Sequence, residues 1–279
     1  LGGSYEPRLY CVQYRETDFD FISRLMEEEG IFFFFEHTED GHVMVMGDSP
    51  DVNAELPEDA LLRFRESDSG MLSEESIFHF RYSRTLRPGA VALKEFDFKK
   101  PALALKSVKA GESDKESKFE IYDYPGEYHV QGLGDRLARV RLEEERAETY
   151  LGVGETDCRR FEPGFRFTIE DHPREELNTE FVILRVRHTG EQPHVGFGGG
   201  GAQVPVFRAT FECAPFKIPY RPARVTPRPL IDGPQTAVVV GPDGEEIHCD
   251  EHGRVKVKFH WDRSDATDDT ASCWMRVSQ

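Results

Sequence analysis

The chain has 279 residues, of which 38% are hydrophobic, so it can bury a sizeable core in one or two domains, and a disordered chain is excluded. Its 35 basic against 52 acidic residues give a net charge of −17, which would repel a phosphate backbone, so we expect no nucleic acid as a partner. The sequence has no apolar run approaching the roughly 20 residues that span a bilayer and no signal-type N-terminal segment, so we expect a chain that is made and stays soluble in the cytoplasm before any export.

The first predicted element is a helix that begins at Asp18 and ends at Gly30. Thr17 is a suitable N-cap residue, and Asp20 places a carboxylate near the positive end of the helix dipole. Apolar residues at spacings of three and four define one face of this helix, namely Phe19, Ile22 and Met26, widened by Phe21 and Leu25.

The acidic triplet Glu27–Glu29 falls in the last turn of this helix, where the dipole disfavours negative charge. Two interpretations are open. The one we favour is a last turn exposed to solvent, and the other is a contact with a basic surface on a neighbouring subunit.

After this helix the sequence predicts mostly strands, so the expected fold is mainly β with two helices. Ile31–Phe35 is aromatic enough to indicate a strand buried on both faces, followed by a turn and a second strand, His42–Met46. Residues 106–118 are charged and small, which predicts a link rather than a strand. Further strands are expected twice within 77–99 and at Phe165–Ile169, Phe181–Val186 and Val204–Cys213, and a second helix at Asp135–Thr149 with Leu133, Leu137 and Val140 on its apolar face.

A proline-rich segment, 219–232, is expected to be an extended linker. Beyond it Val255, Val257, Phe259 and Trp261 alternate with polar residues, as in a strand with one buried face. Thr236–Val240 is its expected partner, and Pro242–Gly244 supplies a tight turn. About 45 residues follow Gly233, fewer than the roughly 70 that a five-stranded barrel needs, so we expect the sequence to be cut inside this domain.

Five cysteines are spread widely through the chain: Cys11, Cys158, Cys213, Cys249 and Cys273. Their number is odd, and the sequence has no Cys-x-x-Cys pair. This pattern favours reduced thiols in a cytosolic compartment over a disulfide framework or a metal cluster.

Two long blocks of sequence carry a resemblance to a known family. The run Gly233–Gly241, the block Asp250–Arg263 and the ending Ser272–Gln279 resemble the spike barrel of VgrG, the valine-glycine repeat protein G family of type VI secretion systems. The block Tyr10–His37 resembles the hub domain of the same family. The two blocks stand in the family's order.

The resemblance implies a phage-hub-like β-barrel domain over residues 1–218, a linker at 219–232 and the start of an oligonucleotide/oligosaccharide-binding (OB) fold spike-neck barrel at 233–279. Further residues are expected before Leu1, and more barrel followed by a β-helical needle after Gln279. The implied function is structural and non-enzymatic: a tip component of a type VI secretion system that caps the secreted tube, carries effectors and punctures target membranes.

The resemblance also implies the partners. Three copies would assemble around an axis and contact the hexameric tube protein, baseplate and spike-tip proteins, and effector proteins, while a target membrane would be met only by mechanical puncture. The protein would be cytoplasmic during assembly, then secreted or injected into a target cell. The alternatives are the scaffold portion of a spike fused to a catalytic effector domain, and a contractile phage or prophage tail hub.

His248–His252 satisfies the inverted zinc-protease pattern His-x-x-Glu-His, whose chemistry needs both imidazoles on one face of a helix. Gly253 follows at once and a strand pattern begins, so the sequence predicts a polar turn between strands. VgrG members usually carry tyrosines at the positions of His248 and His252, which points the same way.

Three other motifs are also assigned structural roles. Gly196–Gly201 matches the dinucleotide fingerprint but precedes a strand-like run containing Pro205, so a hairpin tip is expected. Carboxylate neighbours such as Asp18 with Asp20, and Asp268 with Asp269, arise by chance in so acidic a chain. Arg254, Lys256 and Lys258 alternate with Phe259 and Trp261, so these aromatics are expected to fill the barrel rather than stack on bases. We therefore expect no catalytic, cofactor-binding or metal-ligating residue and no cofactor.

Overall fold

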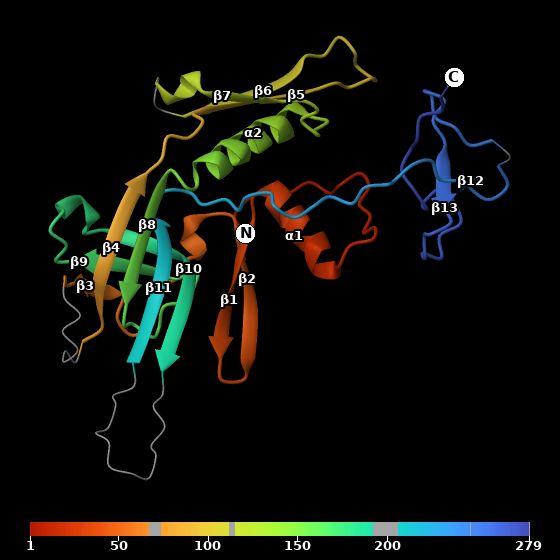
Figure 1. The fold of residues 1–279 in the computed structure, drawn as a ribbon. Helices are drawn as coiled ribbons and strands as arrows, with labels where there is room; N and C mark the ends of the chain where they lie inside the picture. The colour runs from red at the N-terminus through yellow and green to blue at the C-terminus, as the bar shows by residue number, and fades with distance from the viewer. Residues whose placement is uncertain (67–73, 112–114, 192–205, 246, 279) are drawn as a thin grey trace. The chain divides into compact units, whose positions relative to one another are not determined.

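The computed structural model describes residues 1–66, 74–111, 115–191, 206–245 and 247–278 (Figure 1). In these ranges the chain forms two α-helices, thirteen β-strands and the short 3₁₀ helices η1 (Pro50–Val52), η2 (Glu116–Lys118) and η3 (Glu175–Leu177). The mainly β fold with two helices is confirmed. Neither helix in the described ranges has the length and apolar character needed to cross a membrane.

The chain folds into two compact units, each built from two separate stretches of sequence. The first unit contains Leu1–Gly3 and Leu25–Val225, and the second contains Ser4–Arg24 and Thr226–Gln279. The polypeptide therefore passes from one unit to the other after Gly3, after Arg24 and after Val225. The division into a hub at 1–218, a linker at 219–232 and a barrel at 233–279 stays a prediction.

Helix α1 (Asp18–Glu29) has the predicted boundaries. The backbone N–H of Asp20 donates to Oγ1 of Thr17 at 3.1 Å, which is the expected N-cap bond. Gly30 ends the helix at φ +74°, a left-handed conformation that favours glycine. The predicted apolar stripe is buried at Met26 but is 54% exposed at Phe19, because periodicity shows which face is apolar and not what covers it.

Strands β1 (Phe32–Thr38) and β2 (Gly41–Gly47) form an antiparallel hairpin in the first unit. The prediction that the first strand is buried on both faces is wrong. Phe32 and Phe34 are buried, whereas Phe33 and Phe35 on the other face are partly exposed, because a two-stranded sheet has one face against the rest of this unit.

Six strands of the first unit close into a barrel in the order β10-β11-β8-β4-β3-β9 (Figure 1). Their bounds are β3 (Leu61–Phe64), β4 (Ser76–Arg84), β8 (Tyr150–Thr156), β9 (Arg166–Glu170), β10 (Glu180–Glu191) and β11 (Val206–Pro215). The sequence predicts four of them and misses β3 and β8. Strand β3 is short, and β8 contains Gly152 and Gly154, which lower strand propensity.

Aromatic side chains fill the core of this barrel. Phe161, Phe167, Phe181 and Phe211 are each at most 2% exposed. The ring centroid of Phe211 lies 4.9 Å from that of Phe161 and 5.6 Å from that of Phe167, distances typical of favourable aromatic pairs.

A three-stranded sheet and one helix form a second layer of the first unit. The sheet has the order β6-β5-β7, with β5 (Ala90–Glu95), β6 (Leu105–Ala110) and β7 (Glu120–Asp123), and helix α2 (Gln131–Arg146) covers one face. Its core is made by Val91, Leu93 and Leu105 against Leu137, Ala138 and Leu142. The predicted link at 106–118 is therefore wrong at its start, because Leu105 and Ser107 are buried among charged neighbours that obscure the strand pattern.

In the second unit, β12 (Ala237–Val240) and β13 (Lys256–Phe259) pair antiparallel, with Val239 opposite Val257. The predicted partner strand is confirmed, and Gly244 in the connection has the expected positive φ of +87°. Residues far away in sequence join this pair: the Trp261 ring lies 5.3 Å from that of Tyr14. The OB fold stays a prediction.

The aromatic core generates a stability prediction. Replacing Phe211 with alanine should lower the free energy of unfolding by about 3–5 kcal/mol, because the cavity cannot fully collapse. Chemical denaturation of the chain measures this change. The matched control is Phe119→Ala, since Phe119 is 54% exposed and should change the same quantity by about 0.5 kcal/mol or less. Equal effects of the two substitutions would contradict the assignment of the core.

Candidate functional site

The histidine motif lies in a turn between β12 and β13. Nδ1 of His248 is 3.2 Å from a carboxylate oxygen of Glu245, and the centroid of its ring lies 5.0 Å from that of Trp274, with the two rings tilted by 31°. Nε2 of His252 is 3.5 Å from Glu251. The two imidazoles thus contact different carboxylates, and the described part of the chain contains no cluster of three or more potential metal ligands.

Asp250 holds this turn together. Its carboxylate accepts hydrogen bonds from the backbone N–H of His252 at 3.0 Å and of Arg254 at 2.9 Å, and from Nε of Arg254 at 2.6 Å. Desolvation alone would raise the pKa of Asp250, but these hydrogen bonds and the Arg254 charge outweigh it and lower the pKa to about 2.

The other sequence motifs have local roles where the structure describes them. Gly196–Gly201 lies outside the described residues. The carboxylate pairs bind neighbouring groups: Asp18 the side chain of Gln13, Asp20 that of Thr17, Asp268 that of Thr270 and Asp269 that of Lys256. Each pair is thus engaged in caps, turns and ion pairs.

The basic residues of 254–258, next to Phe259 and Trp261, also form contacts within the second unit. Arg254 pairs with Asp250, Lys256 Nζ lies 5.1 Å from the ring centroid of Trp274, and Lys258 Nζ donates to the carbonyl of Ser264 at 2.6 Å. The Phe259 and Trp261 rings stack on each other at 4.9 Å. These contacts favour a structural role for the stretch.

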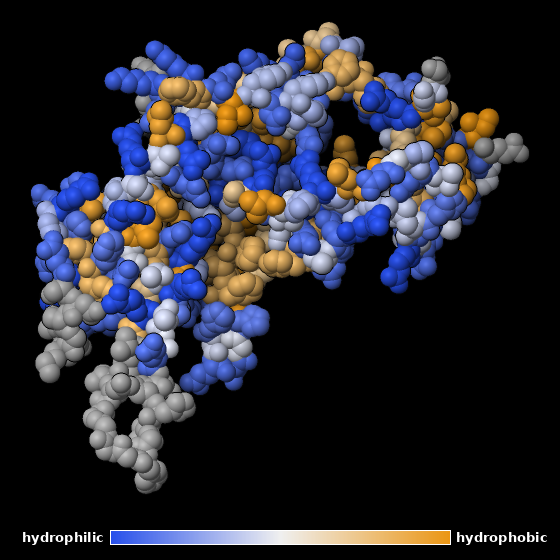
Figure 2. All heavy atoms as spheres, in the orientation of Figure 1, coloured by the Kyte–Doolittle hydropathy of each residue, from blue (hydrophilic) through white to orange (hydrophobic). Residues whose placement is uncertain are grey.

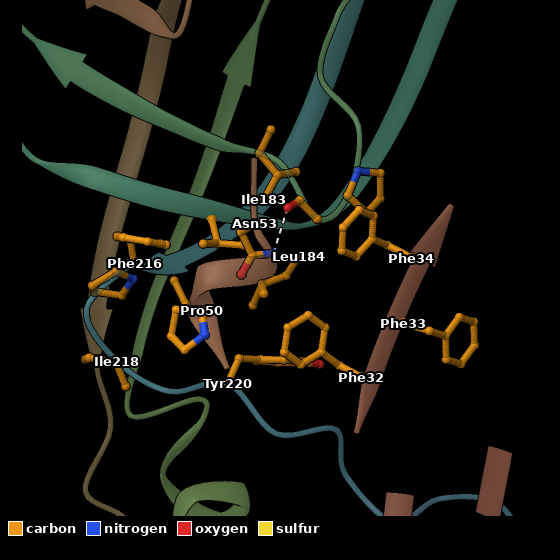
Figure 3. Close-up of a pocket in the computed structure, with 15 residues that line it drawn as sticks. Phe32, Phe33, Phe34, Pro50, Asn53, Ile183, Leu184, Phe216, Ile218 and Tyr220 are labelled. Atoms are coloured by element: carbon orange, nitrogen blue, oxygen red, sulfur yellow. Dashed lines mark hydrogen bonds between the residues drawn. The ribbon is translucent and has the colours of Figure 1, made fainter. Parts of the chain in front are cut away.

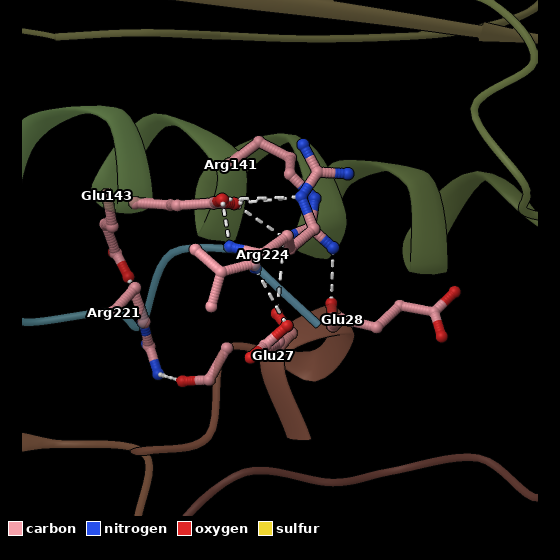
Figure 4. A network of polar contacts seen from close by, with 9 residues as sticks. Glu27, Glu28, Arg141, Glu143, Arg221 and Arg224 are labelled. Atoms are coloured by element: carbon pink, nitrogen blue, oxygen red, sulfur yellow. Dashed lines mark hydrogen bonds and ion pairs between the residues drawn. The ribbon is translucent and has the colours of Figure 1, made fainter. Parts of the chain in front are cut away.

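The structure reveals a polar cluster in the first unit that the sequence analysis missed (Figure 4). It joins the end of α1, helix α2 and an extended strap, which we define as residues 216–225. We call it the tether cluster, and it consists of Glu27, Glu28, Asp48, Arg141, Glu143, Glu144, Arg221 and Arg224.

Arg221 fastens the strap at three points. Its Nε donates to the carboxylate of Glu143 at 2.7 Å, and its Nη1 donates to the backbone carbonyls of Gly30 at 2.9 Å and Asp48 at 2.7 Å. Gly30 is also required by space, because a Cβ there would lie 2.5 Å from Val140. The predicted linker is thus bound to the first unit through Arg221.

Arg141 of α2 caps the C-terminus of α1. Its Nη2 donates to the carbonyl of Glu28 at 2.5 Å and its Nη1 to the carboxylate of Glu144 at 2.8 Å. Its side chain is 8% exposed, and burial lowers the pKa of its guanidinium. A cation at this end satisfies helix carbonyls that lack intrahelical partners and opposes the negative end of the dipole.

The acidic triplet is therefore not a solvent-exposed last turn, and that interpretation is wrong. Glu27 is 9% exposed, Glu29 pairs with Arg136 of α2, and Arg141 binds the carbonyl of Glu28. The basic surface that the second interpretation invoked is present, but it is α2 of the same chain.

The tether cluster also gathers the first unit's ends of the three places where the chain passes between the units, which we call the exits: two where it leaves the first unit and one where it returns. The backbone N–H groups of Gly2 and Gly3 donate to the Asp48 carboxylate at 2.8 and 2.6 Å. The backbone N–H of Val225 donates to the carboxylate of Glu27 at 3.1 Å, and Glu27 follows Leu25 by two residues. All three exits are thus fixed to one cluster of charge-assisted hydrogen bonds.

The start of the strap is held by apolar contacts instead. Phe216, Ile218 and Tyr220 line a cavity of about 90 Å³ together with Phe32 and Phe34. Figure 3 shows Phe32 and Phe34 turned towards this cavity and Phe33 turned away from it. The Tyr220 ring lies 6.0 Å from that of Phe32, and burial raises the pKa of Tyr220. The strap therefore has an apolar anchor followed by a charged one.

The tether cluster yields a first prediction. Replacing Arg141 with methionine should lower the free energy of unfolding of the first unit by about 3–5 kcal/mol, because it removes the buried cation that satisfies the carbonyls of Glu27 and Glu28 and shares Glu144 with Arg224. Denaturant titration measures this. Arg185→Met is the control, since its side chain is 72% exposed in a pair with Glu212 and should cost about 1 kcal/mol or less. A similar small cost for Arg141→Met would refute the proposed anchor.

The turn at Asp250 yields a second prediction. A carboxylate with a lowered pKa stabilises the fold above its unfolded pKa, and this contribution is lost as the pH falls through the folded value of about 2. We expect the fluorescence of Trp274 to change as the pH falls from the unfolded pKa of an aspartate, about 3.9, towards 2. The measurement uses a Trp261→Phe background so that Trp274 is the tryptophan observed. Asp250→Asn should abolish this acid transition, whereas chelation with EDTA at neutral pH should leave the spectrum unchanged. A transition that persists in Asp250→Asn would count against this assignment.

Comparison with known proteins gives consistent matches. Residues 1–194 match the family model of the phage tail baseplate hub (GPD). Over 283 residues the chain is 39% identical to the type VI secretion system spike protein VgrG1c of Pseudomonas aeruginosa, a match covering the whole chain and 38% of that relative. It is 35% identical over 274 residues to the actin cross-linking toxin VgrG1 of Vibrio cholerae, covering 98% of the chain and 25% of that relative.

A solved structure has the same fold. The c3393 protein of E. coli, described as a component of the type VI secretion system, matches with a TM-score of 0.55 and 20% identity, over 94% of this chain and 54% of that one. The chain thus spans about 38% of the length of relatives such as VgrG1c. It belongs to the phage tail baseplate hub family, and its relatives at 38 to 39% identity over the whole chain include VgrG spike proteins of type VI secretion systems.

Proposed function

We propose that this chain forms the hub and the beginning of the spike in a type VI secretion system. The observation that carries the proposal is the alignment of the whole chain with spike proteins at 37 to 39% identity. The closed barrel and the tether cluster support it physically, because a part that transmits force needs a rigid body and firmly fixed connections.

Several finer features belong to the same proposal. Three copies would assemble around an axis, contact the hexameric tube protein and the baseplate and spike-tip proteins, and carry effectors. The protein would assemble in the cytoplasm and then leave the cell or enter a target cell by mechanical puncture. This chain would contribute stiffness and no catalysis.

The tether cluster supports the mechanical role because it spreads a load. A pull on the strap is resisted by the Arg221 bonds to Glu143, Gly30 and Asp48 and by the backbone bond from Val225 to Glu27. Such bonds are short and charge-assisted, and they are roughly twice as strong as neutral ones. Three exits tied to one cluster would move together rather than tear one after another.

A second candidate function is the scaffold portion of a spike fused to a catalytic effector domain. The observation that favours it is the match to a relative named as an actin cross-linking toxin, of which this chain covers 25%. The family model of a phage tail baseplate hub keeps a phage or prophage tail as a third setting for the same mechanical role.

Secretion tests the proposed function. A strain that lacks the gene should release no tube protein into the medium, and the natural full-length gene should restore release. The double variant Arg141→Met with Arg221→Met should restore it only weakly, because the strap is no longer anchored. The exposed-pair control Arg185→Met should restore it fully. Full release by the strain without the gene would refute the function.

The mass of the purified full-length protein tests the assembly. We expect three times the mass of one chain in solution. A stable monomer at micromolar concentration would contradict the proposed hub.

A further inference from the structure

Lysines are distributed very unevenly in this chain. Seven of the ten lie between residues 94 and 118, in and beside the sheet β6-β5-β7 of the first unit. All seven are exposed, and within the described ranges none of them forms an ion pair. In a chain of net charge −17, such an accumulation of unpaired cations is unexpected.

The arginines of the first unit behave differently. Residues such as Arg136, Arg141, Arg166 and Arg221 are engaged in ion pairs with glutamates of the same unit. The unit thus uses arginine to hold itself together, and its exposed lysines other than Lys217 lie in or beside one sheet.

The sheet has one covered face and one open face. Helix α2 packs against Val91, Leu93 and Leu105, and Figure 1 shows α2 running along that side. Because side chains alternate along a strand, Lys94, Lys106 and Val108 point to the opposite face. We call this opposite face the lysine face.

Two of these lysines lie directly opposite each other. Lys94 of β5 is the register partner of Lys106 of β6, and like charges in that position destabilise a sheet. Lysine on an edge strand is a common guard against aggregation, which would account for Lys106. Lys94 lies on the central strand, however, between β6 and β7, so edge protection does not explain it.

An apolar row lies beside the lysine pair. Ala92 is the register partner of Val108 on one side and of Tyr122 on the other. Val108 is 53% and Tyr122 57% exposed. An aromatic residue in an apolar patch, bordered by charge, is typical of a protein-binding surface.

We propose that the lysine face is a docking surface for a separate protein that presents clustered carboxylates beside an apolar or aromatic side chain. Charge complementarity argues for this partner, because opposing carboxylates would neutralise the Lys94–Lys106 pair. A protein is favoured over a membrane or nucleic acid, since the net charge of −17 repels an extended anionic surface, whereas a local acidic patch meets only this face. This inference goes beyond the proposed function and does not depend on it.

The probes are two short end-labelled acidic peptides, an oligoglutamate and a glutamate–tyrosine copolymer, each small enough to meet only the lysine face, titrated with the natural full-length protein. We expect both to bind, the copolymer more tightly. Lys94→Glu should weaken binding about tenfold or more. The same substitution should hold or raise the thermal unfolding midpoint, because it turns a like-charge pair into an opposite-charge pair. Binding lost without loss of stability separates docking from a structural role.

Matched variants complete the test. Lys217→Glu makes the same charge change at an exposed lysine outside the sheet and should leave both affinities unchanged. Tyr122→Ser should remove the preference for the copolymer. The proposal is overturned if Lys94→Glu and Lys217→Glu change the affinities equally. It is also overturned if phosphatidylglycerol vesicles bind through Lys94 more tightly than the copolymer does. A change in the protein's own oligomeric mass on Lys94→Glu would overturn it as well, because the partner would then be a second copy of this chain.

Discussion

The cation at the end of α1 is the contact on which the first unit's connections depend. Arg141 reaches from α2 to the carbonyls of Glu27 and Glu28 in the last turn of α1, and Arg221 reaches from the strap to the carbonyl of Gly30, just beyond the helix. Both guanidinium groups also pair with glutamates of α2. A helix end with unsatisfied carbonyls attracts cations, so a weak point of the backbone becomes the place where three segments are joined.

This arrangement relates the fold to the proposed mechanical function. The barrel with its aromatic core supplies a body that resists deformation, since close-packed interiors have low compressibility. The strap and the N-terminal residues are bound to that body by directed, charge-assisted bonds at Asp48, Glu27 and Glu143. Membership of the phage tail baseplate hub family is consistent with the mechanical role that we propose.

The two kinds of basic residue divide the work in the first unit. Arginine forms planar, bidentate contacts that suit internal pairs, whereas lysine is a compact and strongly hydrated charge that remains in solvent. Arg141 and Arg221 therefore appear in the tether cluster, and Lys94 and Lys106 on the open face of the sheet. Their placement shows where the unit stabilises itself and where it tolerates repulsion.

Local sequence determined the elements whose signals are local. Thr17 and Gly30 predicted the bounds of α1. The alternation at Val255–Trp261 predicted a strand that pairs with the run before it, as β13 does with β12. Long blocks of residues predicted the family. Tertiary structure alone decided the partners of Glu27–Glu29, the strand at 105–110 and the anchoring of Arg221. The strand pairs with residues 10 to 20 positions away, and the other contacts join residues 78 to 198 positions apart. Composition shows that opposite charges exist, but only the folded chain decides which of them meet.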